Sequence, residues 1–91
     1  MINEFDKSFS KSLDKLKDSN IKKRIEQVIQ EFDNANSILE IKNVKKLVGF
    51  KSYYRIRLGD YRLGIELKNP TIVRFIVIAH RKDIYKIFPK K

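Results

Sequence analysis

The sequence predicts an α+β fold, in which an N-terminal antiparallel helical hairpin packs on one face of a mostly antiparallel sheet of about four strands. Two observations predict it. Apolar residues recur at helical spacing in the first third of the chain, whereas they alternate at strand spacing after residue 51. Helices that come before the strands, rather than between them, are typical of α+β domains. With 91 residues and no internal repeat or flexible linker, the chain is expected to form a single domain, 1–91.

Two helices are predicted before residue 37. Apolar side chains recur every three or four positions, as Phe9, Leu13 and Leu16 in the first helix and as Ile21, Ile25, Val28, Ile29 and Phe32 in the second. Asp6 is a suitable N-cap for the first helix, and a polar break at residues 18–20 separates the two. Because this break is short, the helices should form an antiparallel hairpin. The residues before Phe5 are expected to add a short edge strand.

The strands are predicted in the second half of the chain. Residues 37–50 fit no single period, so we expect a connecting loop with a helical turn that ends at Gly49. Alternating or β-branched segments predict strands at residues 53–58, 61–67 and 72–79, and a last short strand at about 83–88. Gly59-Asp60 should join the first two strands by a two-residue turn, because a type II′ turn prefers glycine in its first central position.

This hairpin places three arginines on one face of the predicted sheet. A two-residue turn pairs Arg57 with Arg62 and Arg55 with Gly64, and side chains alternate along each strand. Like charges directly opposite each other destabilise a sheet. An anion between the arginines would turn this repulsion into binding, because the planar guanidinium grips phosphate oxygens in pairs. Gly64 would leave room for the ligand. The alternative is that the long side chains splay into water.

The third strand is expected to extend the arginine face. Regular alternation turns Val73, Phe75, Val77 and Ala79 toward the helices and turns Arg74, Ile76, Ile78 and His80 toward the arginines, on a face otherwise left open. His80 and Arg81 would end the strand beside the arginines, with Tyr85 four residues further on.

The charge of the chain points to a polyanionic partner. The net charge is +10, and residues 49–91 carry 11 basic and only 3 acidic groups. Such a field attracts nucleic acid, an acidic protein or an anionic membrane surface, although a basic surface can also serve solubility alone. With one histidine, no cysteine and no glycine-rich phosphate loop, we expect no metal site and no cofactor. The chain lacks an apolar leader or span, so a cytoplasmic protein without membrane contact is expected.

Two segments, LVGFKSYYRIRLGDYRL at residues 47–63 and VIAHRKDIYK at residues 77–86, together with the preceding helices, resemble the RelE/ParE toxin superfamily. The resemblance covers nearly the whole chain and implies a RelE-like fold. It also implies a toxin of a type II toxin–antitoxin system that a cognate antitoxin neutralises. RelE-type members are metal-independent endoribonucleases that cut mRNA in the ribosomal A site and so inhibit translation. ParE-type members poison DNA gyrase instead.

The resemblance also implies roles for single residues. Arg55 and Arg57 lie where RelE-type toxins have two basic residues, often lysines, and Arg62 and Arg81 match two arginines of the family. Tyr85 matches a C-terminal tyrosine that stacks on a base or assists proton transfer. This set favours the RNase over the gyrase poison, while a non-catalytic RNA-binding module stays open as a third reading.

The general base is the open point of this assignment. Arginine does not lose its proton in proteins, so Arg55 and Arg57 are poor bases. His80 is the better candidate, because histidine is the side chain that ordinarily exchanges a proton near neutral pH. The expected catalytic set is therefore Arg55, Arg57, Arg62, His80, Arg81 and Tyr85.

Overall fold

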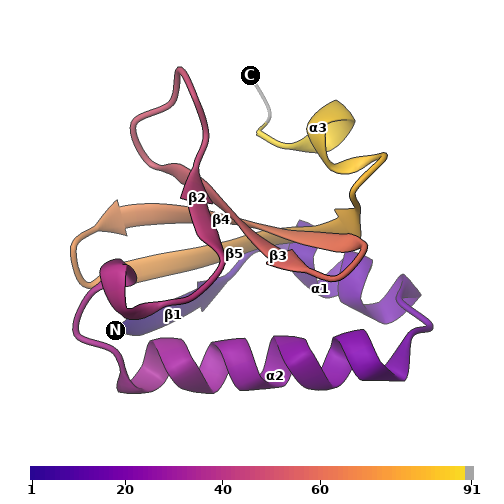
Figure 1. Cartoon of the computed structure of the whole chain (residues 1–91), viewed down its shortest axis with the longest axis horizontal. Coiled ribbons are helices and arrows are strands. Elements are labelled where there is room, and N and C mark those ends of the chain that lie inside the picture. Colours follow the sequence, from indigo (N-terminus) through magenta and orange to yellow (C-terminus); the bar gives the residue numbers. More distant parts are fainter. Residues whose placement is uncertain (90–91) are drawn as a thin grey trace.

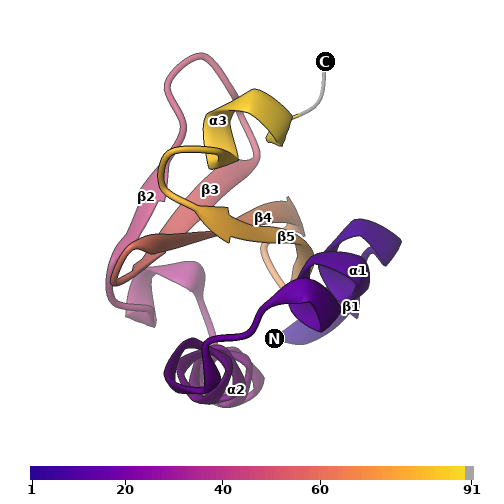
Figure 2. The ribbon, with the colours of Figure 1, turned by 90° about the vertical axis from the view of Figure 1, so that its right-hand side faces the viewer.

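Five strands form one sheet that has two helices on one face and a short helix on the other (Figures 1 and 2). The computed structural model describes residues 1–89. Its elements are β1 (Ile2–Phe5), α1 (Lys7–Lys15), α2 (Ser19–Asn34), a 3-10 turn (Ile38–Glu40), β2 (Val44–Lys46), β3 (Tyr53–Leu58), β4 (Tyr61–Asn69), β5 (Ile72–His80) and α3 (Ile84–Ile87). The strand order is β1-β5-β4-β3-β2, in which β1 is parallel to β5 and the other pairs are antiparallel. The predicted α+β class is confirmed.

The sheet has five strands, whereas about four were predicted, and the two sets differ in which segments form strands. The edge strand predicted before Phe5 is β1, and the helical turn predicted within residues 37–50 is the 3-10 turn. The same segment also contains β2, which pairs with β3 where only a loop was expected. Because β2 has three residues, two of which are the exposed Lys45 and Lys46, it shows no alternation that sequence reading could detect.

Helices α1 and α2 both lie on one side of the sheet (Figure 2). Their buried apolar side chains pack with those of the strands and form the main core. Asp6 and Asp18 cap them by accepting hydrogen bonds from backbone N–H groups of the first turns. Phe32 and Phe75 are fully buried where α2 meets β5, with their ring centroids 5.6 Å apart in an edge-to-face arrangement. Within residues 1–89, no helix is both long enough and apolar enough to cross a membrane.

The opposite face of the sheet is covered near its centre, contrary to the prediction of an open face. The segment predicted as a last strand at about 83–88 forms the one-turn helix α3 instead. Ile84 and Phe88 lie four residues apart, so one side of this turn carries both, and both are buried against Val77 in a second core cluster. Gly64 makes room for Phe88 rather than for a ligand, because a Cβ atom at Gly64 would lie 2.8 Å from the Phe88 ring.

A β-bulge in β5 reverses the predicted alternation of that strand. Gly64 pairs with Val77 whereas Ile65 pairs with Phe75, so Ile76 is an extra residue between the two pairs. Val73 and Phe75 face the helices as predicted. Beyond the bulge the prediction is wrong, since Val77 and Ala79 pack in the second cluster on the opposite face while Ile78 joins the main core.

Replacing Gly64 by alanine should destabilise the protein by about 1–3 kcal/mol, because the added methyl group overpacks the Phe88 ring. Urea denaturation of the two proteins measures the difference in free energy of unfolding. In a Phe88→Ala background the same change should cost much less, because the colliding ring is gone. Equal costs in both backgrounds would contradict this account of Gly64.

Candidate functional site

The β3–β4 hairpin brings three arginines to the face of the sheet that carries α3. Its register is the predicted one, with Arg57 opposite Arg62 and Arg55 opposite Gly64. Gly59 has a φ of 60°, which the first central position of the turn requires. A single glycine therefore sets which face of the hairpin carries the arginines, because a shift of one residue would send them to the helix side.

Lys45 extends the arginines onto β2, and sequence reading did not find it. It is the direct partner of Arg55 in the β2–β3 ladder, so it lies on the same face, and its side chain is exposed. The sequence around Lys45 gives no sign of the strand that sets its side chain on this face, so its role could not be predicted. The cations of this face on three adjacent strands, Lys45, Arg55, Arg57 and Arg62, are called the basic row below.

Arg62 lies at the electrostatic centre of the site. Partial burial lowers the pKa of its guanidinium, and the positive charges of Arg55, Arg57 and Arg81 lower that pKa further, while Tyr85 acts in the opposite direction. All four residues thus lie close enough to act on Arg62. A lowered pKa means that the folded protein disfavours the extra positive charge there, so a bound anion relieves an existing repulsion.

The Arg62 side chain is oriented by the hairpin turn. Its Nη1 atom donates to the carbonyl oxygens of Gly59 and Tyr61, at 2.7 and 2.9 Å. Arg81 is tied to the same turn, because its backbone N–H donates to the Asp60 carbonyl at 2.8 Å and its Nε lies 3.8 Å from Asp60 Oδ1. That ion pair is exposed and contributes little stability, so an anion can compete for the Arg81 guanidinium.

His80 does not join the basic row, which corrects its predicted placement. The bulge at Ile76 sets His80 opposite Tyr61 instead, where the two rings contact edge to face with centroids 5.6 Å apart. Its Nδ1 accepts a hydrogen bond from the Lys82 backbone N–H at 3.2 Å. Ala79 occupies the position opposite Arg62 in its place.

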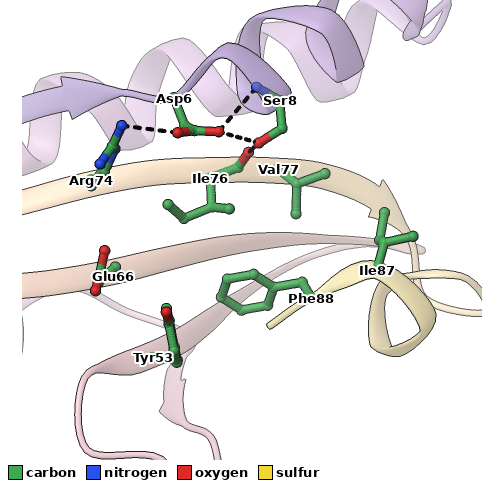
Figure 3. Close-up of a pocket in the computed structure, with 9 residues that line it drawn as sticks. All are labelled: Asp6, Ser8, Tyr53, Glu66, Arg74, Ile76, Val77, Ile87 and Phe88. Carbon is green, nitrogen blue, oxygen red and sulfur yellow. Dashed lines mark hydrogen bonds and ion pairs between the residues drawn. The ribbon is translucent and has the colours of Figure 1, made fainter. Parts of the chain in front are cut away.

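A cavity on this face lies beyond Phe88, away from Arg57 and Arg62. It has a volume of about 450 Å³ and is lined by Asp6, Ser8, Tyr53, Glu66, Arg74, Ile76, Val77, Ile87 and Phe88 (Figure 3). Within it, Arg74 Nη2 lies 2.9 Å from Asp6 Oδ1, and Ser8 Oγ donates to the Ile76 carbonyl. These contacts fasten the start of α1 to β5, so we interpret this polar group as structural.

The chemistry available at this site is anion binding by the basic row, together with proton exchange by two groups. The four cations of the basic row and Arg81 offer hydrogen-bond donors that suit phosphate oxygens. The amine of Lys45 and the phenol of Tyr85 are the groups that can exchange a proton. Over residues 1–89, no cluster of three or more His, Asp or Glu side chains is placed to hold a metal ion. The expected metal independence of the chemistry stays a prediction.

Two comparisons of the sequence with known proteins both match toxins. Residues 4–85 match the family model described as the ParE toxin of the type II toxin-antitoxin system parDE. Toxin RelE3 of Methanocaldococcus jannaschii is 46% identical over 86 residues, which cover 93% of this chain and 96% of that protein.

Solved structures agree with the sequence comparison. In the crystal structure of the RelB-RelE antitoxin-toxin complex from Methanococcus jannaschii, one chain superposes with a TM-score of 0.80 at 44% identity, over 94% of this chain and 99% of that one. The isolated E. coli RelE toxin superposes with a TM-score of 0.63 at 21% identity, over 87% of this chain and 82% of that one. The second likeness shows the fold alone.

Inorganic phosphate should stabilise the protein through the basic row. Added phosphate should raise the melting temperature, because a ligand that binds only the folded state shifts the unfolding equilibrium. In Arg57→Gln the phosphate-induced rise should shrink, while stability without phosphate should increase by some tenths of a kcal/mol because a like-charge pair is gone. Differential scanning fluorimetry measures both. Lys46→Gln is the matched control, because it removes one charge from the opposite face of β2 and should keep the full rise.

Proposed function

The chain belongs to the RelE/ParE superfamily of type II toxin–antitoxin toxins, and from that premise we propose that it is an endoribonuclease that cleaves mRNA. The observation that carries the proposal is the basic row on one sheet face, with Arg81 and Tyr85 within electrostatic reach of Arg62. RNA supplies its own nucleophile in this reaction, so the protein has to provide charge stabilisation, orientation and proton transfer.

The basic row supports the electrostatic part of the reaction. The 2′-oxygen attacks the adjacent phosphorus, the bond to the 5′-oxygen breaks, and a 2′,3′-cyclic phosphate and a 5′-hydroxyl result. The phosphoryl oxygens gain negative charge on the way to the transition state. Arg57 and Arg62, directly opposite each other, are placed to accept that charge, and Arg55 and Arg81 flank them. Preorganised donors of this kind typically contribute about a hundredfold each to the rate.

Lys45 takes the role of proton acceptor in this proposal. Arginine cannot accept the 2′-hydroxyl proton, and the structure sets His80 on the Tyr61 side of the sheet. Lys45 is the amine of the basic row and lies directly opposite Arg55, and an amine in its neutral form is a base. The proton passes from the 2′-oxygen to Lys45 Nζ, and the 5′-oxygen takes up a proton from water as it leaves.

We also propose that a cognate antitoxin neutralises the protein. The similar toxin of Methanococcus jannaschii was crystallised with the antitoxin RelB. An acidic segment of such a partner would complement the excess positive charge of the second half of this chain. Cleavage in the ribosomal A site, in the cytoplasm, is the setting that the family resemblance implies.

Inhibition of DNA gyrase is the second candidate function. The family model that matches residues 4–85 is that of the ParE toxin, which makes this alternative a specific one. Loss of supercoiling activity of purified gyrase, while cellular mRNA stays intact, would favour it over the RNase.

The variant Arg62→Ala/Tyr85→Ala should lose both growth arrest and mRNA cleavage. Loss of the Arg62 contact alone should lower the cleavage rate by about a hundredfold. Induced expression without antitoxin, followed by mapping of mRNA 5′ ends, measures both effects. Lys46→Ala, on the helix side of β2, is the control and should stay toxic. A double variant as toxic as the parent would overturn the assignment of the site.

Lys45→Gln and Lys45→Arg separate proton transfer from charge. If Lys45 accepts the proton, both variants should lose at least about a hundredfold in rate, because a guanidinium does not deprotonate. The pH dependence of the remaining rate should also lose its rise toward alkaline pH. Rates at saturating RNA, measured from pH 6 to 10, test this. His80→Gln should keep the parental profile, since His80 packs on Tyr61. Full activity of Lys45→Arg would reduce Lys45 to an electrostatic role.

A further inference from the structure

The cavity beyond Phe88, called the α3 cavity below, lies where three parts of the fold meet. Its floor is the sheet, one wall is α3 through Ile87 and Phe88, and the other wall is the start of α1 through Asp6 and Ser8 (Figure 3). Its volume of about 450 Å³ falls in the range of small-molecule sites, which are concave and mostly apolar with a few polar groups. A partner helix or strand needs a larger, extended surface instead.

The α3 cavity is separate from the basic row. Arg62, Gly64 and Glu66 point to the same face of β4, because side chains alternate along a strand. The Phe88 ring packs on Gly64, so it stands between Arg62 of the basic row and Glu66 of the α3 cavity. The reaction proposed above makes no use of Glu66, and a ligand of the α3 cavity need not be an anion.

Glu66 supplies an unpaired carboxylate to the α3 cavity. Residues 49–91 contain three acidic groups, of which Asp60 and Asp83 each form an ion pair. In the described part of the chain, residues 1–89, the Glu66 carboxylate has no ion pair and no hydrogen bond. Arg74 is its direct partner across the β4–β5 ladder, but the Arg74 guanidinium lies 2.9 Å from Asp6 instead. One negative charge is therefore left uncompensated in a chain whose net charge is +10.

The charged and apolar parts of the α3 cavity lie at opposite ends. Figure 3 shows Glu66, Tyr53 and Arg74 at one end and Ile87 at the other, with Phe88 between them. Tyr53 is the direct partner of Glu66 on β3, so the half-buried carboxylate lies beside an aromatic ring. An aromatic face attracts a cation, as a carboxylate does. This end of the cavity thus suits a positive head group, and the rest suits an apolar body.

We propose that the α3 cavity binds a small organic cation, which has an ammonium or guanidinium head group on an apolar body. The head group donates hydrogen bonds to Glu66 and lies against the Tyr53 ring. The apolar body packs along Ile76, Phe88 and Ile87. An inorganic cation would leave these apolar walls in water, and an anion would meet the unpaired carboxylate. The inference goes beyond the proposed function, because binding in this cavity does not require RNA.

The probe is tryptamine, a primary ammonium on an indole ring, titrated into the purified full chain. Two-dimensional ¹H–¹⁵N NMR spectra show where it binds, and the amide signals of Glu66, Ile76 and Ile87 should shift together. The dissociation constant should be on the order of 1 mM or below, as expected for so small a ligand. Tryptophol, in which a hydroxyl replaces the ammonium, is the neutral analogue and should bind about three- to tenfold more weakly.

Glu66→Gln separates the charge of the α3 cavity from its shape. This variant should bind tryptamine about three- to tenfold more weakly than the parent and should bind tryptophol as the parent does, because only the cation uses the carboxylate charge. Glu26→Gln is the matched control, since Glu26 is exposed on α2 and does not line the cavity, and it should keep the parental affinity for tryptamine. Ile87→Ala should weaken both ligands by a similar factor, because it removes apolar wall.

Three results would overturn the inference. They are equal binding of tryptamine and tryptophol by the parent, equal affinity of Glu66→Gln and Glu26→Gln for tryptamine, and NMR shifts that do not include the residues of the α3 cavity. RNA cleavage is assayed separately with the same parent protein. A parent that binds tryptamine in the cavity but cleaves no RNA would overturn the proposed function alone. A parent that cleaves RNA but does not bind tryptamine would overturn this inference alone.

Discussion

The contact of the Phe88 ring with Gly64 is the interaction on which the site depends. It is possible because β4 has no side chain at this point, where a Cβ atom would lie 2.8 Å from the ring. Through Phe88 and Ile84 the one-turn helix α3 is held on the sheet, although so short a helix has no stability of its own. This docking brings Tyr85 toward Arg62, whereas Arg81 is held at the hairpin turn by Asp60. The same ring also lines the cavity that contains the Arg74–Asp6 ion pair.

The β-bulge at Ile76 decides which residues of β5 reach that face. Without it, Ile78 and His80 would lie on the arginine side and Val77 would enter the main core. The extra residue exchanges the two sets, so Val77 meets Ile84 and Phe88. It also sets the small Ala79, instead of a larger side chain, opposite Arg62. The one extra residue in β5 thus provides both the apolar surface on which α3 packs and the space around the arginines.

Local patterns predicted the fold class, the two helices, the arginine hairpin and its register, because each depends on neighbours in the sequence. Asp6 and Gly59 act as their residue types indicate. Tertiary contacts decided the rest. Three residues of β2 carry no periodicity, so Lys45 was not recognised. The bulge at Ile76 leaves no sign in a continuous β-branched run, so His80 was set on the wrong face. Ile84 and Phe88 fit a helical turn as well as a short strand, and only burial against Val77 selects the turn.

The second core cluster and the basic row are separate groups of residues on this face. This separation explains how the like charges are tolerated. Arg57 opposite Arg62 costs some tenths of a kcal/mol, whereas full burial of side chains such as Ile84 and Phe88 contributes about 1.5–3 kcal/mol each. The second cluster therefore outweighs the repulsion several-fold, and the cations need not contribute to folding at all. Their positions are free to suit an anionic ligand. Gly64 receives the Phe88 ring, which belongs to the second core cluster. Arg62 lies two residues away on the same face of β4 and belongs to the basic row. The same stretch of β4 therefore supplies both stability and charge.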